Sequence, residues 1–152
     1  RARLLMANAD DRRAAFGPSA FRPVALVHSE QRSQRLHQRR ASQLVRVEPD
    51  HAALKTLAKV GVVAPHPPGA DAQFEVRAFA AAIGIPEDPV TGSLNASLAQ
   101  WLTTAGHAPD RYVAAQGARV GRAGRVHLER DSSSAVWVGG VTRDVIAGTV
   151  AL

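Results

Sequence analysis

The residue types best suited to chemistry stand together in one short segment, Glu87-Asp88-Pro89-Val90-Thr91-Gly92-Ser93. These seven residues, the signature segment, come directly before an amphipathic helix. The first backbone N–H groups of a helix lack acceptors within the helix and favour an anion. The segment therefore predicts a compact site for an anionic ligand. Spacing alone fits a well-capped core helix after a tight turn equally well.

The helix that follows the signature segment must position this site. Its apolar residues recur at helical spacing and form one stripe: Leu94, Leu98, Trp101, Leu102 and Ala105. Gly106 comes next and is typical of a C-terminal cap. The pattern predicts a helix over residues 92–105 with Leu98, Trp101 and Leu102 in the core.

The signature segment resembles that of the phenazine-biosynthesis (PhzF-like) family of isomerases. The similarity extends upstream to Arg77-Ala78-Phe79 and Gly84-Ile85. Downstream it includes the turn and strand elements Gln116-Gly117, Gly121-Arg122, Gly124-Arg125-Val126 and Val138-Gly139-Gly140. These elements cover residues from about 48 to 152, roughly two thirds of the chain. A signature in such surroundings is much more specific than a lone glycine motif.

The remaining pattern and the resemblance favour an α+β fold. A short helix over residues 51–60, capped by Asp50, is followed by strands predicted at 62–64, 73–79, 112–115, 125–129, 135–138 and 145–151. The resemblance implies one lobe of a diaminopimelate-epimerase-like fold, in which a curled β-sheet wraps around a central helix, here at about 92–105. No internal repeat is visible, so we expect one lobe, over residues 47–152.

Residues 1–46 are rich in arginine and match the family poorly. They carry a formal charge of +7, whereas residues 47–152 carry −1, which gives +6 for the whole chain. Three interpretations remain open: a nucleic-acid-binding arm, a solvated face of ordinary structure, or sequence from a shifted reading frame. The arm is disfavoured because only Phe16 and Phe21 could stack on bases. Residues 29–40 are poor in apolar side chains, so no buried element is expected there.

The resemblance assigns roles within the signature segment. Asp88 is expected to hydrogen-bond polar groups of the substrate, and Gly92 and Ser93 to hold its carboxylate. Thr91 is expected to shape the turn. The family's reaction is a proton shift between two carbons without a metal or redox cofactor, and its acid/base glutamate lies in the other lobe. No catalytic residue is therefore assignable in this chain, and we expect surface positions for Glu30, Glu48, Glu75 and Glu129.

Composition excludes several kinds of chemistry. The chain has no cysteine, which rules out the thiol acid/base pair of related epimerases and agrees with a cytoplasmic protein. No apolar run is long enough to span a membrane, and the six histidines lack metal-ligand spacing. Arg122 and Arg125 are expected in solvent, and Trp137 in the core or at a lobe interface.

The leading prediction is the C-terminal lobe of a PhzF-like isomerase that binds a small carboxylate substrate without a cofactor. We expect this chain to be inactive alone, because the lobe with the catalytic glutamate is missing from it. The alternative is a non-catalytic small-anion-binding or remnant protein. A homodimer is compatible with the sequence, membrane association is not expected, and nucleic-acid binding is the least favoured function.

Overall fold

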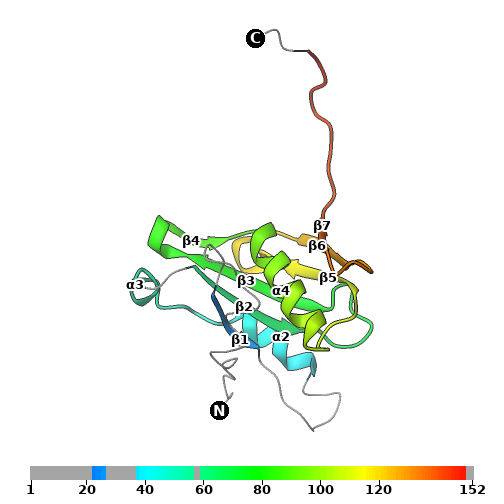
Figure 1. Cartoon of the computed structure of the whole chain (residues 1–152). Coiled ribbons are helices and arrows are strands. Elements are labelled where there is room, and N and C mark those ends of the chain that lie inside the picture. The colour runs from blue at the N-terminus through cyan, green and yellow to red at the C-terminus, as the bar shows by residue number, and fades with distance from the viewer. Residues whose placement is uncertain (1–21, 27–36, 57–58, 150–152) are drawn as a thin grey trace.

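A mixed β-sheet with one long helix on its face dominates the computed structural model, which describes residues 22–26, 37–56 and 59–149, and side chains from residue 41 onward (Figure 1). The helices are α2 (His37–Val45), α3 (His51–Leu54) and α4 (Gly92–Thr104), with 3-10 turns at Ala81–Ile83 and Ala118–Val120. The strands are β1 (Arg22–Leu26), β2 (Val60–Pro65), β3 (Phe74–Ala80), β4 (Ile85–Asp88), β5 (Arg111–Gln116), β6 (Gly124–Arg130) and β7 (Val136–Gly139). This mixture confirms the α+β class.

Strand β3 lies at the centre of the sheet and pairs with three other strands. The described strands follow the order β1-β2-β3-β5-β6-β7, and β4 joins β3 as a branch. One edge of β3 pairs with β2 along its length up to Phe79. The other edge is shared, because β5 pairs with residues 74–76 and β4 pairs with Ala78 and Ala80. The sheet therefore forks beside Arg77.

Helix α4 packs on one face of the sheet and forms the core with it. Leu94, Leu98 and Leu102 are at most 1% exposed and belong to one apolar cluster with inward-facing residues of β2, β3, β5 and β6. Gly61 of β2 lets the helix lie close, because a Cβ there would come within 2.3 Å of a Leu94 methyl carbon. The predicted burial of Leu98 and Leu102 is confirmed.

The outer side of α4 departs from expectation. Gln100 and Ala105 are exposed and Trp101 is half-buried against the core. The described strands cover only one side of α4, as Figure 1 shows. The described strands thus do not surround the helix, and the wrapped arrangement stays a prediction, whereas the helix bounds agree with the prediction to within one residue.

Gly106 ends α4 as predicted. Its φ of 70° is in the left-handed region that favours glycine. The Gly106 N–H donates to the Thr103 carbonyl at 3.1 Å, and the His107 N–H donates to the Leu102 carbonyl at 2.8 Å. This pair of bonds is a Schellman motif, which satisfies carbonyl groups of the last turn.

The opposite face of the sheet carries α2. Ala41 and Leu44 of this helix are 3% and 6% exposed, and the helix packs against β2 and β3. Strand β1 runs parallel to β2 at the edge of the sheet. Two elements of the Arg-rich segment thus adjoin the main sheet. Most of that segment, Glu30, Phe16 and Phe21 included, lies outside the described residues, and its division from the rest at residue 46 stays a prediction.

Two predicted elements are shorter or absent. The helix expected over 51–60 is the four-residue α3, capped by Asp50, whose Oδ1 accepts the N–H groups of Ala52 and Ala53 at 3.0 Å; residues 57–58 lie outside the described residues. The strand expected over 145–151 is not formed at 145–149, and residues 140–149 extend away from the sheet (Figure 1). No described strand lies beside this segment to pair with its backbone, and residues 150–151 are not described.

The other five predicted strands agree with β2, β3, β5, β6 and β7 to within two residues at each end. Trp137 of β7 is 65% exposed, so its predicted core position is wrong. Its indole N–H donates to Asp131 Oδ2 at 2.8 Å, and a position at a lobe interface stays a prediction. No described helix combines the length and apolar character needed to cross a membrane.

Candidate functional site

The signature segment connects β4 to α4 across the fork in the sheet. Asp88 ends β4 and pairs with Ala78 of β3. Thr91 is the N-cap residue of α4, with extended backbone angles of φ −119° and ψ 98°, and Gly92 and Ser93 begin the helix. The four residues predicted for the site therefore lie at the amino end of α4.

Thr91 orients Asp88 rather than capping the helix with its hydroxyl. Its Oγ1 donates to Asp88 Oδ2 at 2.8 Å, and its side chain bonds to none of the first-turn amides. Thr91 is 7% exposed, so this bond is shielded from water. The other Asp88 oxygen, Oδ1, accepts only a long bond of 3.4 Å from the Val90 N–H among the described residues. Asp88 thus keeps one oxygen available to a ligand donor.

Gln116 of β5 and Asn95 of α4 complete this polar network, and neither was assigned to the site from the sequence. Gln116 Nε2 donates to the Asp88 carbonyl at 2.9 Å and to Thr91 Oγ1 at 3.0 Å. Gln116 Oε1 accepts from the Thr91 N–H at 3.2 Å and from Asn95 Nδ2 at 2.8 Å. Both side chains are at most 2% exposed, so these hydrogen bonds are shielded from water.

The sequence held one signal for this network. Asn95 follows Leu94 on the buried side of the predicted helix, four residues after Thr91, where an apolar residue would be ordinary. Its Nδ2 also donates to the Thr91 carbonyl at 2.9 Å. Gln116 comes close to the signature segment through the pairing of β5 with β3. The resemblance included Gln116-Gly117 as a turn element but gave Gln116 no role in the site.

Two glycines allow the signature turn to lie against β5 and β6. Gly117 has a φ of 95°, and a Cβ there would come within 2.5 Å of the Pro89 carbonyl oxygen. A Cβ on Gly124 would come within 2.5 Å of a Val90 methyl carbon and 2.7 Å of the Gln116 carbonyl oxygen. Because backbone atoms form part of both contacts, side chains at these positions would displace the turn.

The amino end of α4 leaves hydrogen-bond donors free for a ligand. Gly92 and Ser93 are exposed, and no described residue accepts from their N–H groups or from the Ser93 hydroxyl. Apart from its chain neighbours and the backbone of its own helix, a Cβ on Gly92 would meet no atom within 4 Å, so the approach is open. An anion at an exposed helix N-terminus is stabilised by about 0.3–1 kcal/mol. The turn can therefore hold a carboxylate beside the acceptor Asp88.

Arg122 and Arg125 do not take part in this turn. Both are exposed, which confirms the predicted solvated positions. Arg125 donates to Asp71 Oδ2 from two nitrogens at 2.9 and 2.7 Å. This hydrogen bonding lowers the pKa of Asp71.

The predicted surface position of Glu75 is wrong. Glu75 is 3% exposed, and its Oε2 lies 3.1 Å from His66 Nε2, while its Oε1 has no partner among the described residues. Burial raises the pKa of Glu75. The side chain projects from β3 on the face opposite α4, as alternation along a strand predicts. Alternation does not predict that this face is also covered, and the cover is what buries Glu75. Glu48 and Glu129 form exposed ion pairs, as expected.

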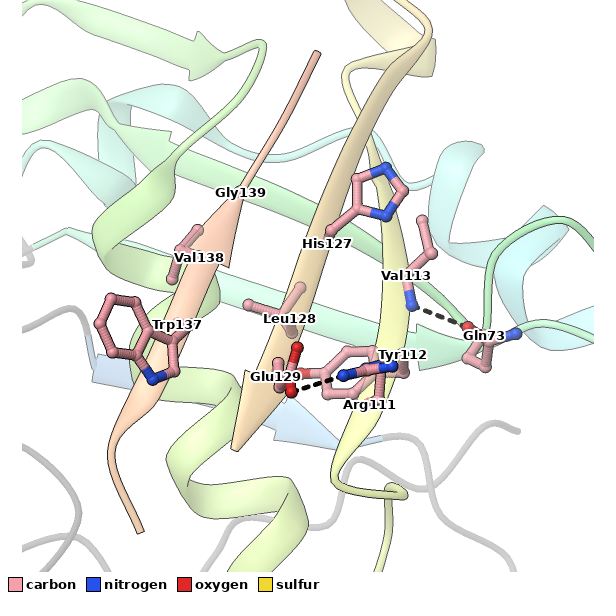
Figure 2. A pocket seen from close by; sticks show the side chains of 10 residues that line it. All are labelled: Gln73, Arg111, Tyr112, Val113, His127, Leu128, Glu129, Trp137, Val138 and Gly139. Atoms are coloured by element: carbon pink, nitrogen blue, oxygen red, sulfur yellow. Dashed lines mark hydrogen bonds and ion pairs between the residues drawn. The ribbon is translucent and has the colours of Figure 1, made fainter. Parts of the chain in front are cut away.

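A pocket with a volume of about 610 Å³ lies away from the signature segment, over β5, β6 and β7 (Figure 2). Trp137, His127 and the Arg111–Glu129 ion pair are among its lining residues. No residue of the signature segment lines it, so the candidate site is an open turn rather than this hollow. Within the described residues, no three His, Asp or Glu side chains are grouped to hold a metal ion.

Comparisons with known proteins support the family resemblance seen in the signature segment. The model of a family described as phenazine biosynthesis-like protein matches residues 16–148, a range that includes β1 and α2. A protein of Deinococcus radiodurans, named an uncharacterized isomerase, is 38% identical over 98 residues, which are 59% of this chain and 32% of that protein.

Solved structures share the fold. A PhzC/PhzF phenazine biosynthesis protein of Clostridium difficile (strain 630) has a TM-score of 0.59 at 22% identity, covering 98% of this chain and 54% of that one. A PhzF-family protein of Bacillus anthracis has a TM-score of 0.51 at 18% identity, covering 76% and 39%. A PhzF-family protein of Enterococcus faecalis has a TM-score of 0.50 at 25% identity, covering 64% and 38%.

The chain therefore spans about half the length of these relatives or less. The family match nevertheless extends over most of the chain and includes the signature segment at the start of α4. This chain belongs to the phenazine biosynthesis-like (PhzC/PhzF) family.

Proposed function

We propose that this chain is the C-terminal lobe of a PhzF-like isomerase and binds a small carboxylate substrate at residues 88–93. The observation that carries the proposal is the set of free donors at Gly92 and Ser93 beside an Asp88 that buried residues hold in place. The lobe is of the diaminopimelate-epimerase-like type, acts without a cofactor, and works in the cytoplasm.

Each part of the turn has a distinct role in this proposal. The Gly92 and Ser93 N–H groups and the Ser93 hydroxyl donate to the carboxylate, and charge-assisted bonds of this kind are stronger than neutral ones. Asp88 Oδ1 accepts from a hydroxyl or amino group of the same substrate. A ligand with a carboxylate and a nearby donor therefore fits, because the donor separates the two negative charges.

The proton shift itself requires an acid/base group that this turn lacks. Thr91 and Ser93 are poor bases, and Asp88 has one oxygen bonded to Thr91 and the other assigned to a hydrogen bond from the substrate. We propose that a glutamate of a second lobe supplies the base, so that residues 1–152 alone have no isomerase turnover. Turnover by this chain that disappears in Glu75→Gln would place the base here instead.

Binding to the Ser93 hydroxyl tests the proposal. Acetate affinity measured by titration at constant ionic strength should fall at least about tenfold in Ser93→Ala, since a bond to a charged group contributes about 1.5–3 kcal/mol. Ser132→Ala is the matched control, because Ser132 is also exposed and lies in the loop between β6 and β7, outside the signature segment and α4. Equal loss in both variants, or none in Ser93→Ala, would contradict the proposed carboxylate contact.

A non-catalytic anion-binding protein is the second candidate, and the engagement of the four described glutamates in ion pairs or with His66 favours it. It shares the carboxylate site and differs in needing no second lobe. The gene sequence immediately upstream of the Arg1 codon, read in all three frames, separates the two. A family lobe with its glutamate there supports the isomerase, and unrelated sequence in every frame supports the second candidate. A homodimer stays a prediction.

A further inference from the structure

We propose that Arg77 is a positioning residue that couples residues 44–47 to the signature segment and thereby sets carboxylate affinity at residues 88–93. This inference rests on the proposed function, because the affinity concerns the same site. Arg77 lies on β3 at the fork of the sheet, between Val76, which pairs with β5, and Ala78, which pairs with β4.

The Arg77 guanidinium is buried and almost fully bonded. Its Nε donates to Glu87 Oε1 at 2.9 Å and its Nη2 donates to Glu87 Oε2 at 2.7 Å. Its Nη1 donates to the Leu44 carbonyl at 2.9 Å and to the Val47 carbonyl at 2.6 Å. The side chains of Arg77 and Glu87 are 2% and 7% exposed. Four donors of one rigid group thus fix two segments of the chain relative to each other.

One of these segments is the carboxyl end of α2. The last turn of α2 holds no basic residue, so the Arg77 cation supplies from β3 the positive charge that favours a helix C-terminus. The Leu44 carbonyl also accepts the Val47 N–H at 3.2 Å. The guanidinium therefore holds the end of α2 and the residues after it against the sheet.

The other segment is the signature segment itself, through its first residue. Glu87 is held on both carboxylate oxygens, and the next residue, Asp88, is the proposed ligand acceptor. Arg77 thus fixes the start of the turn, while Gln116 fixes its middle from the other side of the fork. A shift of α2 would therefore move the Arg77 guanidinium, which in turn would move Glu87 and the adjacent Asp88.

This arrangement is suited to geometry more than to stability. Desolvation of a buried ion pair offsets much of its attraction, so such a pair is weak evidence for a stabilising role. Its two parallel bonds do specify one orientation, which a lysine cannot reproduce because its ammonium is a single point charge. The structure therefore assigns Arg77 a role that charge alone does not fulfil.

The experiment compares Arg77→Lys with the wild-type chain, using acetate as the probe. Affinity is measured per folded molecule, and hydrogen exchange at the amides of Asp88, Val90 and Thr91 is measured without ligand. We expect acetate to bind about fivefold or more weakly, with faster exchange at these amides. Arg111→Lys is the matched control, since Arg111 makes an exposed bond to Glu129 from β5. Glu87→Gln, which preserves shape, is the second variant if Arg77→Lys does not fold.

Unchanged acetate affinity and unchanged exchange at the amides of Asp88, Val90 and Thr91 in the folded variant would overturn the inference, even if the variant were less stable. A purely structural role predicts that result, with only the folded fraction reduced. If wild-type chain does not bind acetate, the proposed function fails, and the exchange data alone decide the positioning role. Faster exchange in Arg77→Lys or Glu87→Gln but not in Arg111→Lys would then support it, and equal exchange in all would overturn it.

Discussion

Replacement of Gln116 by alanine should destabilise the protein far more than a typical polar substitution. Gln116 bridges β5 and the signature segment with four hydrogen bonds of 2.8–3.2 Å, and its side chain is 2% exposed. Its partners are the backbone of Asp88 and Thr91, the Thr91 hydroxyl and the Asn95 amide. The substitution therefore removes the hydrogen bonds by which a β5 side chain holds the turn.

The expected loss follows from which partners remain bonded. Asn95 Nδ2 keeps its bond to the Thr91 carbonyl at 2.9 Å, and the Thr91 hydroxyl keeps Asp88 Oδ2 at 2.8 Å. The Thr91 N–H and the Asp88 carbonyl lose their side-chain partner. Each buried group left unpaired costs about 1–3 kcal/mol, and water can reach part of the space. We expect the free energy of unfolding to fall by about 2–4 kcal/mol.

Urea denaturation followed by tryptophan fluorescence measures this loss. Gln100→Ala is the matched control, because Gln100 is exposed on α4 and its replacement should change stability by less than about 0.5 kcal/mol. Acetate affinity of folded Gln116→Ala should also fall, since Asp88 and Thr91 lose their support. A Gln116→Ala variant as stable as Gln100→Ala would refute the role of this network.

Leu98→Ala should lower the free energy of unfolding by about 2–5 kcal/mol, because Leu98 is 1% exposed; a urea-measured loss like that of an exposed residue would contradict its core position. Glu75→Gln should change the pH dependence of stability. Burial raises the pKa of Glu75 in the folded state. The contribution of Glu75 to the free energy of unfolding is therefore most favourable below the ordinary glutamate pKa and declines as pH rises through the raised value. In urea titrations, the free energy of unfolding of the variant relative to wild type should therefore increase with rising pH. A difference that does not change with pH would exclude a raised pKa for Glu75. Gly92→Val should fold normally, because the space around Gly92 is open, but should weaken acetate binding in calorimetric titrations; unchanged affinity would mean that the ligand does not approach Gly92.

Much of the fold on the α4 side was predictable because its determinants are local. The apolar stripe of α4 and the alternation along β3 each follow from the spacing of neighbouring residues. Gly106 was recognisable as the helix end for the same reason. The absence of a strand at 145–149 was not predictable, because β-branched residues indicate a strand only when a partner strand is present.

The candidate site was predictable only in the part contributed by contiguous residues. Asp88, Thr91, Gly92 and Ser93 are neighbours in sequence, so a signature could identify them. Gln116 lies 28 residues from Asp88 and reaches the turn through pairing of β5 with β3. Arg77 is only ten residues from Glu87, but its other partners, the Leu44 and Val47 carbonyls, lie 30 or more residues away. Such contacts depend on sheet topology, which a local pattern does not determine.

The central claim, that the amino end of α4 binds a carboxylate, is tested most directly by amide chemical shifts. A ¹⁵N-labelled sample of the whole chain is titrated with acetate, with chloride at equal ionic strength as control. We predict that shift changes specific to acetate cluster at residues 91–95, where the free N–H groups lie. Changes confined to the Arg-rich residues 31–40, or shared equally with chloride, would contradict the claim and leave the signature segment as a helix cap alone.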